Sequence, residues 1–195
     1  MNKIILGVFL VIFSLGQILA QNLQPGQKRW ESSNKLSIKD YHIKTSGNNN
    51  EEVFSQFLIT HSFSGFDFFK KNLNQKIQNI FLGNASWIDT TKVNRIKKQI
   101  DFQQLQFDLA EIHARKFRKR VLENKKQMVK GLDIVSQINN EIISEFSVSR
   151  LKFIKETKSG TDEIKLQEWR NKILNDLKKL EEFNYLNKKK IKVNR

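Results

Sequence analysis

The feature that most constrains the fold is a long amphipathic stretch over residues 93–121. Apolar residues recur there at alternating steps of three and four, which is the period of one face of an α-helix. The stripe consists of Val93, Ile96, Ile100, Phe107, Ala110, Ala114, Phe117 and Val121. Gln103 interrupts it. We predict a long central helix that begins near residues 89–91, whose side chains can cap it, and ends near 130–131.

Two further helices and two strands are predicted around this helix. Residues 132–153 and 162–186 carry apolar side chains at helical spacing, and a break at 157–161 separates them. Residues 53–69 and 76–87 are rich in β-branched and aromatic residues, which favours an antiparallel hairpin with a long connection. The expected fold class is α+β, with a small antiparallel sheet packed against the central helix and the two further helices.

The first twenty residues have the layout of a secretory signal peptide. Lys3 gives a weakly positive start, residues 4–12 form an apolar run, and Ala20 is a small residue suited to precede a cut. We expect cleavage near Ala20–Gln21. The alternative is a membrane anchor, but the apolar stretch is short for a span of about 20 residues.

The remaining chain is predicted to be one domain. Its 195-residue length suits a single core. Residues 21–29 are expected to form a flexible leader, 30–186 the domain, which opens with a short strand and turn, and 187–195 a solvated basic tail. The chain has no Cys, so disulfides and lipoprotein acylation are excluded. We therefore expect a periplasmic or secreted protein with no transmembrane span after cleavage.

Three local patterns occur in order along the chain. Trp30 precedes residues 34–41, which read Asn-Lys-Leu-Ser-Ile-Lys-Asp-Tyr. Residues 102–116 read Phe-Gln-Gln-Leu-Gln-Phe-Asp-Leu-Ala-Glu-Ile-His-Ala-Arg-Lys. Residues 156–160 read Glu-Thr-Lys-Ser-Gly, and a Gln and a Trp follow on the next predicted helix, at Gln167 and Trp169.

Together these patterns resemble a family of exported bacterial zinc-dependent proteases, catalogued as domain of unknown function 922. Its members show Trp then Asn-Arg/Lys-Leu-Thr-Trp-x-Asp-Phe, a helix with His-Glu-Gln-x-His-Phe-Asp-Ile-Ala-Glu, and Glu-Thr-x-His-Gly. In this chain the second Trp is Ile38 and the Phe is Tyr41. The resemblance spans residues 30–183 and implies a zincin-like arrangement.

The chain departs from this family where the zinc chemistry resides. By the resemblance, Phe102 and Gln106 replace the two His of the zinc helix, Gln103 replaces the general base, and Ser159 replaces a further His ligand. A phenyl ring has no lone pair for a metal, and an amide accepts no proton near neutral pH. We therefore expect a pseudoenzyme with no metal, no cofactor and no catalytic residue.

Other catalytic chemistry has little support in the sequence. His42, His61 and His113 are the chain's His residues, and each is isolated in sequence. Asp108 and Glu111 are expected to form an acidic patch that pairs with nearby cations at helical spacing. A hydrolase with relocated ligands remains an alternative. No Cys nucleophile or Gly-rich phosphate loop occurs.

The net charge of +15 supports a second kind of function. A strongly basic protein favours anionic lipid, glycan or nucleic acid as a partner. The candidate anion-binding residues are Arg115, Lys116, Arg118, Lys119, Arg120, Lys188, Lys189 and Lys190. Solubility alone could also explain the charge. Two kinds of function are therefore expected. Either the cleft of the inactive protease-like site holds a peptide or protein, or the chain is a cationic module that binds an anionic surface.

Overall fold

The structure is a computed structural model that describes residues 23–47, 52–91 and 93–192. The predicted signal peptide and its cleavage site lie outside these residues. The fold is α+β, as predicted, with two small sheets and three α-helices among the described residues. No helix in the described part of the chain has the length and apolar character needed to cross a bilayer.

Six short strands form two three-stranded sheets. The strands are β1 (Gln27–Arg29), β2 (Ile43–Thr45), β3 (Val53–Phe54), β4 (Phe57–His61), β5 (Ile77–Leu82) and β6 (Trp87–Asp89). The first sheet has the order β1-β5-β4 and is antiparallel throughout. The predicted hairpin is confirmed by β4 and β5, in which Phe57 pairs with Phe81 and His61 with Ile77. The second sheet has the order β2-β6-β3, and its β2–β6 pair is parallel. The predicted small antiparallel sheet is thus the first of the two, and the second sheet was not predicted.

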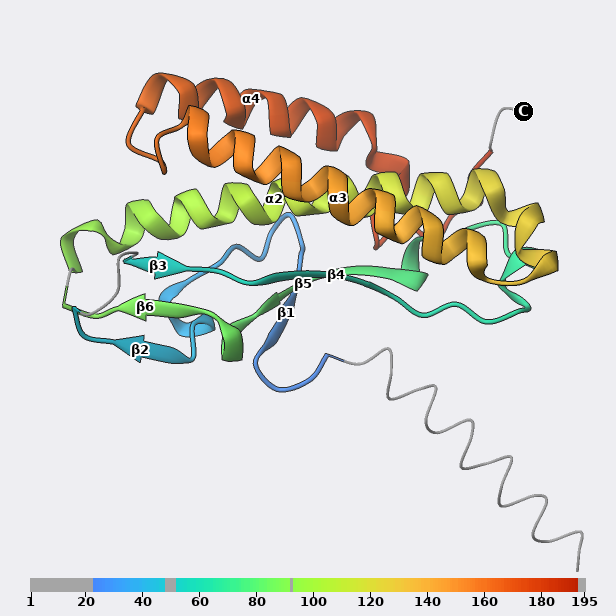
Figure 1. Ribbon diagram of the computed structural model, residues 1–195, viewed down its shortest axis with the longest axis horizontal. Helices are drawn as coiled ribbons and strands as arrows, with labels where there is room; N and C mark the ends of the chain where they lie inside the picture. The colour runs from blue at the N-terminus through green and yellow to red at the C-terminus, as the bar shows by residue number, and fades with distance from the viewer. Residues whose placement is uncertain (1–22, 48–51, 92, 193–195) are drawn as a thin grey trace, which may run out of the picture.

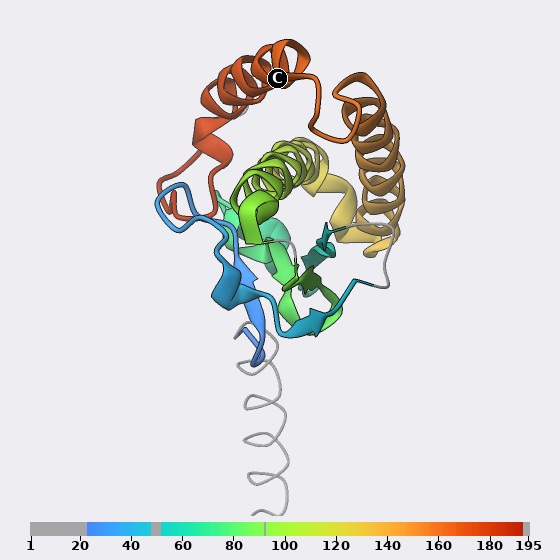
Figure 2. The same ribbon diagram turned by 90° about the vertical axis from the view of Figure 1, so that its left-hand side faces the viewer.

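The central helix α2 (Val93–Asn124) runs between the sheets and the other two helices, α3 (Asp133–Glu156) and α4 (Glu163–Lys179) (Figures 1 and 2). Beyond Asn124 the chain continues as a 3₁₀ segment, η5 (Lys125–Lys130), and Gly131 then adopts φ 135°. That φ lies in a region that favours glycine, which explains why the helical segment ends there. The predicted end near 130–131 is thus the end of η5, six residues beyond the α-helix.

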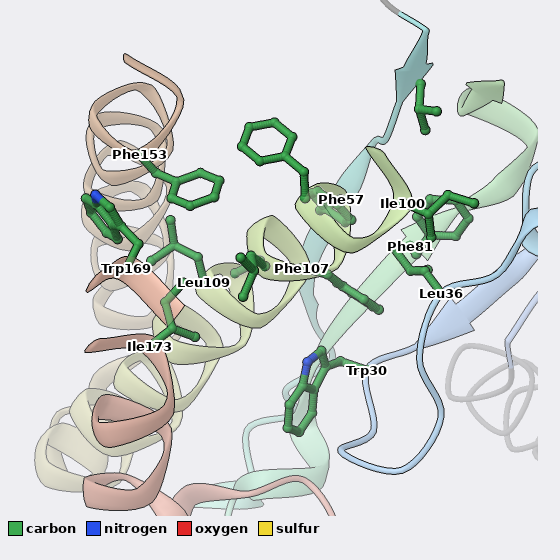
Figure 3. Close-up of a cluster of buried hydrophobic side chains, with 14 of the residues drawn as sticks. Trp30, Leu36, Phe57, Phe81, Ile100, Phe107, Leu109, Phe153, Trp169 and Ile173 are labelled. Carbon is green, nitrogen blue, oxygen red and sulfur yellow. The ribbon is translucent and has the colours of Figure 1, made fainter. Parts of the chain in front are cut away.

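The core surrounds α2 on both sides and consists of two hydrophobic clusters. Figure 3 shows the larger cluster, in which aromatic rings from several elements meet. Phe107 of α2 stacks on Phe57 of β4 with ring centroids 5.1 Å apart. On the opposite side, Phe153 of α3 meets Trp169 of α4 edge to face at 5.4 Å. The first contact attaches the sheet to α2, and the second joins α3 to α4, while Phe153 also stacks on Phe102 of α2.

Both predicted flexible ends are partly ordered. Residues 27–29 of the predicted leader form β1, because Gln27 to Arg29 pair with Leu82 to Ile80 of β5. In the predicted tail, Ile191 is buried and its N–H donates to the Lys71 carbonyl at 3.2 Å. The Asn72 side chain donates to the Asn187 and Lys189 carbonyls at 2.9 and 2.6 Å. The tail is therefore attached to residues 71–72 at positions 187, 189 and 191, while Lys188, Lys189 and Lys190 are exposed, as predicted for a solvated tail.

Candidate functional site

A cleft lies between β3, the first half of α2, the second half of α3 and the turn that joins α3 to α4. Its volume is about 670 Å³. The cleft is lined by all four residues that the resemblance assigns to the positions of a zinc site, namely Phe102, Gln103, Gln106 and Ser159. The other lining residues are Glu52, Val53, Phe54, Arg95, Gln99, Ser147, Arg150, Leu151, Ile154 and Thr161. Residues about fifty positions apart in the chain are thereby brought into one concave site.

Phe102 forms an apolar wall of this cleft. Its ring stacks on Phe153 of α3 with centroids 5.0 Å apart, and its side chain is buried. Gly160 lies directly against it, because a Cβ at that position would approach a ring carbon of Phe102 to 2.8 Å. The backbone of Gly160 also has φ 84°, which favours glycine. Where a metal-binding imidazole is expected by the resemblance, the chain therefore has a ring that packs against the α3–α4 turn.

A chain of polar contacts joins the two glutamines to α3 and β3. Arg150 Nε donates to Gln106 Oε1 at 2.8 Å, Gln106 Nε2 donates to Gln103 Oε1 at 3.1 Å, and Gln103 Nε2 donates to the Val53 carbonyl at 3.0 Å. Arg150 also donates to the Ser55 carbonyl at 3.1 Å. Both amide oxygens thus accept hydrogen bonds and a guanidinium lies next to them, which is an environment that disfavours a metal cation.

The rest of the cleft combines charge with exposed apolar surface. Arg95 forms an ion pair with Glu52, with 3.2 Å between Nη1 and Oε1. Phe54 stacks on Trp87, and Leu151 on α3 is 68% exposed. A concave site with apolar walls and a few polar groups is the usual form of a ligand-binding pocket. These groups can hold side chains and amide groups of a peptide.

The first two sequence patterns contact each other through hydrogen bonds. Trp30 Nε1 donates to Asp108 Oδ1 at 2.7 Å, and Gln104 Nε2 donates to the same oxygen at 2.7 Å. The N–H of Leu36 donates to Gln104 Oε1 at 2.7 Å. Asp108 therefore fixes the N-terminal segment on α2. The predicted pairing with a cation at helical spacing is confirmed for Glu111, which pairs with Arg115, whereas Asp108 contacts Trp30, Gln104 and Lys35.

The third pattern is fixed in a similar way. Trp169 Nε1 on α4 donates to Glu156 Oε2 at the end of α3, at 2.8 Å. Thr157 is buried and its hydroxyl donates to the Phe153 carbonyl at 2.7 Å. These bonds position the α3–α4 turn and with it Ser159, whose backbone has φ 55°. Pattern residues outside the cleft thus serve to hold the elements that form it.

Two of the predicted anion-binding residues are buried, so the prediction is wrong for Arg115 and Arg118. Each is 1% exposed, and both contact Glu111, which is equally buried. Glu111 Oε1 accepts from Arg115 Nε at 3.1 Å and from Arg118 Nη1 at 2.7 Å. Arg118 also donates to the Ile77 and Phe183 carbonyls. Their charges are satisfied internally and link α2 to β5 and to the segment after α4.

The other predicted cations do not form one anion-binding surface. Arg120 contacts Glu145 of α3 at 2.7 Å and Glu141 at 3.7 Å. Lys119 lies 4.0 Å from Glu123, and Lys116 is half-buried. Lys188, Lys189 and Lys190 lie on the ordered tail, which follows residues 71–74. Within the described residues, no group of three or more His, Cys, Asp and Glu side chains is arranged to hold a metal ion.

The three His residues lie in separate environments. His42 Nδ1 lies 2.7 Å from Asn84 Oδ1, and His61 at the end of β4 meets the Phe117 ring edge to face at 5.6 Å. His113 is 2% exposed, and its Nδ1 has no hydrogen-bond partner among the described residues. Burial, reinforced by the positive charge of Lys116, lowers the pKa of His113 to about 4 from an ordinary 6.5.

This pKa shift predicts that stability falls in mild acid. Between pH 6.5 and 4 the unfolded chain binds a proton at His113 that the folded chain does not, so the free energy of unfolding rises with pH. We expect a loss of about 3 kcal/mol from pH 7 to pH 4, measured by urea unfolding. His61 lies at the exposed end of β4, and partial desolvation lowers its pKa in the same direction.

A His113→Phe variant removes the titrating group while keeping a ring beside Phe146. Its unfolding free energy should depend much less on pH than that of the native chain. The control His61→Gln should retain most of the dependence. Equal slopes for the native chain and His113→Phe would show that His113 is not the group responsible.

Comparison with known proteins found no matching family model, no matching curated protein and no matching solved structure.

Proposed function

We propose that this chain is an exported, non-catalytic relative of the zinc-dependent protease family of domain of unknown function 922, and that its cleft binds a peptide or protein segment. The observation that carries the proposal is that Phe102, Gln103, Gln106 and Ser159 line one cavity. Phe102, Gln103 and Gln106 are neighbours on α2, so the informative member is Ser159, which the resemblance selected and which reaches the same cavity from the α3–α4 turn. Further support comes from the hydrogen bonds between the first two patterns and from the close approach of Gly160, in the third pattern, to Phe102 in the second. The proposal includes a zincin-like arrangement of the helices and strands around the cleft.

The chemistry of the cleft supports binding without hydrolysis. Metal-assisted hydrolysis needs a water activated by a cation and a base that accepts its proton. Gln103 is a neutral amide at the position of the base, and its oxygen accepts a hydrogen bond from Gln106. The buried Gln is tolerated because it is hydrogen-bonded, whereas an ionised Glu without a metal would cost several kcal/mol there. The cleft retains its shape and its polar groups.

The test measures binding and cleavage on the same substrate. Denatured, fluorescently labelled casein is mixed with the chain beginning at Gln21, which contains every residue of both hydrophobic clusters. We expect a rise in anisotropy on binding and no release of fragments, with or without a chelator. Leu151→Glu should weaken binding about tenfold, because it places a charge on the cleft wall and removes apolar contact.

Val148→Glu is the matched control. It lies on the same helix, its side chain is 65% exposed against 68% for Leu151, and it does not line the cleft. Equal effects of the two substitutions would place the binding outside the cleft. Fragment release that a chelator abolishes would favour the alternative of an active peptidase with relocated ligands.

A further inference from the structure

An exposed apolar tip lies at the other end of α2 from the cleft (Figure 1). It is formed by Phe66 and Phe69, at the 3₁₀ turn η2 (Asp67–Phe69), and by Val129 of η5, which are 79%, 70% and 63% exposed. The segments η2 and η5 contact each other. Lys125 of η5 reinforces this contact by donating to the Lys70 carbonyl at 2.8 Å. Three large apolar side chains are thus presented together to solvent, which marks an interaction site.

The turn that presents the two rings is firmly held. Asp67 is 1% exposed and its carboxylate pairs with Lys70 at 2.8 Å and with Lys76 at 3.1 Å. The same carboxylate accepts from the Ser64 N–H at 2.7 Å. Phe68 packs against the smaller hydrophobic cluster. Phe66 and Phe69 are therefore exposed on an anchored turn, and the Phe69 ring rests on that of Phe68 with centroids 4.0 Å apart.

Lysines surround the apolar tip. We define the lysine rim as Lys70, Lys71, Lys125, Lys126, Lys130 and Lys188. Lys70 and Lys188 line one small hollow with Lys76, and the ordered tail keeps Lys188 beside residues 70–72. The nearby Asp67 is buried in ion pairs, and Asp133 at the start of α3 is an exposed carboxylate close by. The rim is therefore strongly positive and contains no Arg.

We propose that this end of the molecule docks on an anionic lipid bilayer, with Phe66, Phe69 and Val129 inserted at the headgroup level. Exposed aromatic and aliphatic groups gain free energy there by burial, and surrounding Lys side chains keep their ammonium groups among anionic headgroups. A second copy of this chain is disfavoured as the occupant, because each carries a formal charge of +15. Single-stranded nucleic acid is disfavoured because Val129 offers no face for base stacking and the rim lacks Arg.

The apolar tip and the cleft lie at opposite ends of α2. The helix α2 has 32 residues and is therefore about 48 Å long at about 1.5 Å per residue. The cleft uses its first part, residues 95–106, and the apolar tip lies beyond its last residue. Docking through the tip would leave the cleft open to solvent at the far end of the molecule, so both surfaces can be occupied at once.

The experiment is flotation with vesicles. The protein used begins at Gln21, so that the apolar N-terminal segment cannot contribute to binding. It is mixed with vesicles of phosphatidylcholine alone or of phosphatidylcholine with added phosphatidylglycerol. We expect binding to anionic vesicles that weakens with salt, and little binding to neutral ones. The double variant Phe66→Ala with Phe69→Ala should reduce the partition coefficient about tenfold or more. Replacing Lys71, Lys126 and Lys130 with Gln should reduce it at least about tenfold.

The control is Ile164→Ala with Leu174→Ala, which removes two apolar side chains of α4 that are 75% and 57% exposed. This variant should bind vesicles like the native chain. Circular dichroism on each variant verifies the fold, and single substitutions of Phe66 or Phe69 replace the double variant if it unfolds. Equal losses in the tip and control variants would overturn the proposal. The proposal would also be overturned if the chain did not bind the vesicles but bound a single-stranded oligonucleotide tightly, in a way that depends on Phe66 and Phe69.

Discussion

Replacing Glu111 with Gln should lower the free energy of unfolding by about 3–5 kcal/mol, because the change leaves two buried guanidinium groups without their shared carboxylate. Glu111, Arg115 and Arg118 are each 1% exposed. The one other carboxylate that pairs with them in the described structure is Glu181, which lies 2.8 Å from Arg115 Nη1 and is 65% exposed at its side chain. It cannot neutralise Arg118 in the same way.

The effect on stability is measured by denaturant unfolding, in which the midpoint should fall while the slope stays unchanged. Glu123→Gln is the matched control. It makes the same chemical change on the same helix, but Glu123 is exposed and lies 4.0 Å from Lys119, so we expect a change of about 0.5 kcal/mol or less. If Glu111→Gln proved as mild as Glu123→Gln, the buried network would not be a main source of stability.

The long elements were predictable from the sequence because their apolar residues recur at the spacing of one buried face. The stripe of α2 gave the position of the central helix, and Gln103 was recognised as a polar residue on that stripe. The strands β4 and β5 were recognised by their β-branched and aromatic content. The short strands β1, β2 and β3 were not identified, since two or three residues carry no period and their pairing depends on partners such as β5 and β6.

The charged residues of α2 show why burial of a charge is hard to predict. Arg115 and Arg118 resemble solvent-facing residues by sequence, and apart from Glu111 on the same helix the groups that satisfy them come from distant segments. The carbonyls of Leu177 and Phe183 lie more than sixty positions along the chain, and that of Ile77 lies on β5. Nothing local in the sequence of α2 indicates these partners.

Arg150 was the functional residue that sequence reasoning missed. It follows Phe146 by four residues and precedes Phe153 by three, so it lies on the buried side of α3 between two core aromatics. A cation at such a position is a signal of an internal partner, and its partner is Gln106. The four positions of the former zinc site came from the family resemblance. Periodicity alone would not have selected Ser159, which lies in a turn.

The central claim is that the cleft occupies the position of a lost zinc site, and the most demanding prediction is that the site can be rebuilt. A fourfold variant combines Phe102→His, Gln103→Glu, Gln106→His and Ser159→His, which supplies three imidazoles and a carboxylate. It is prepared with and without Arg150→Gln, because the guanidinium that contacts Gln106 would oppose a cation. Circular dichroism and denaturant unfolding establish that each variant is folded.

The measurement is the zinc content of the purified chain after dialysis against zinc and then against metal-free buffer. We expect no stoichiometric zinc in the native chain and about one zinc per chain in at least one of the rebuilt variants. One equivalent of zinc in the native chain, lost when Gln106 and Ser159 are replaced by Ala, would contradict the account. Folded rebuilt variants that bind no zinc would equally contradict it.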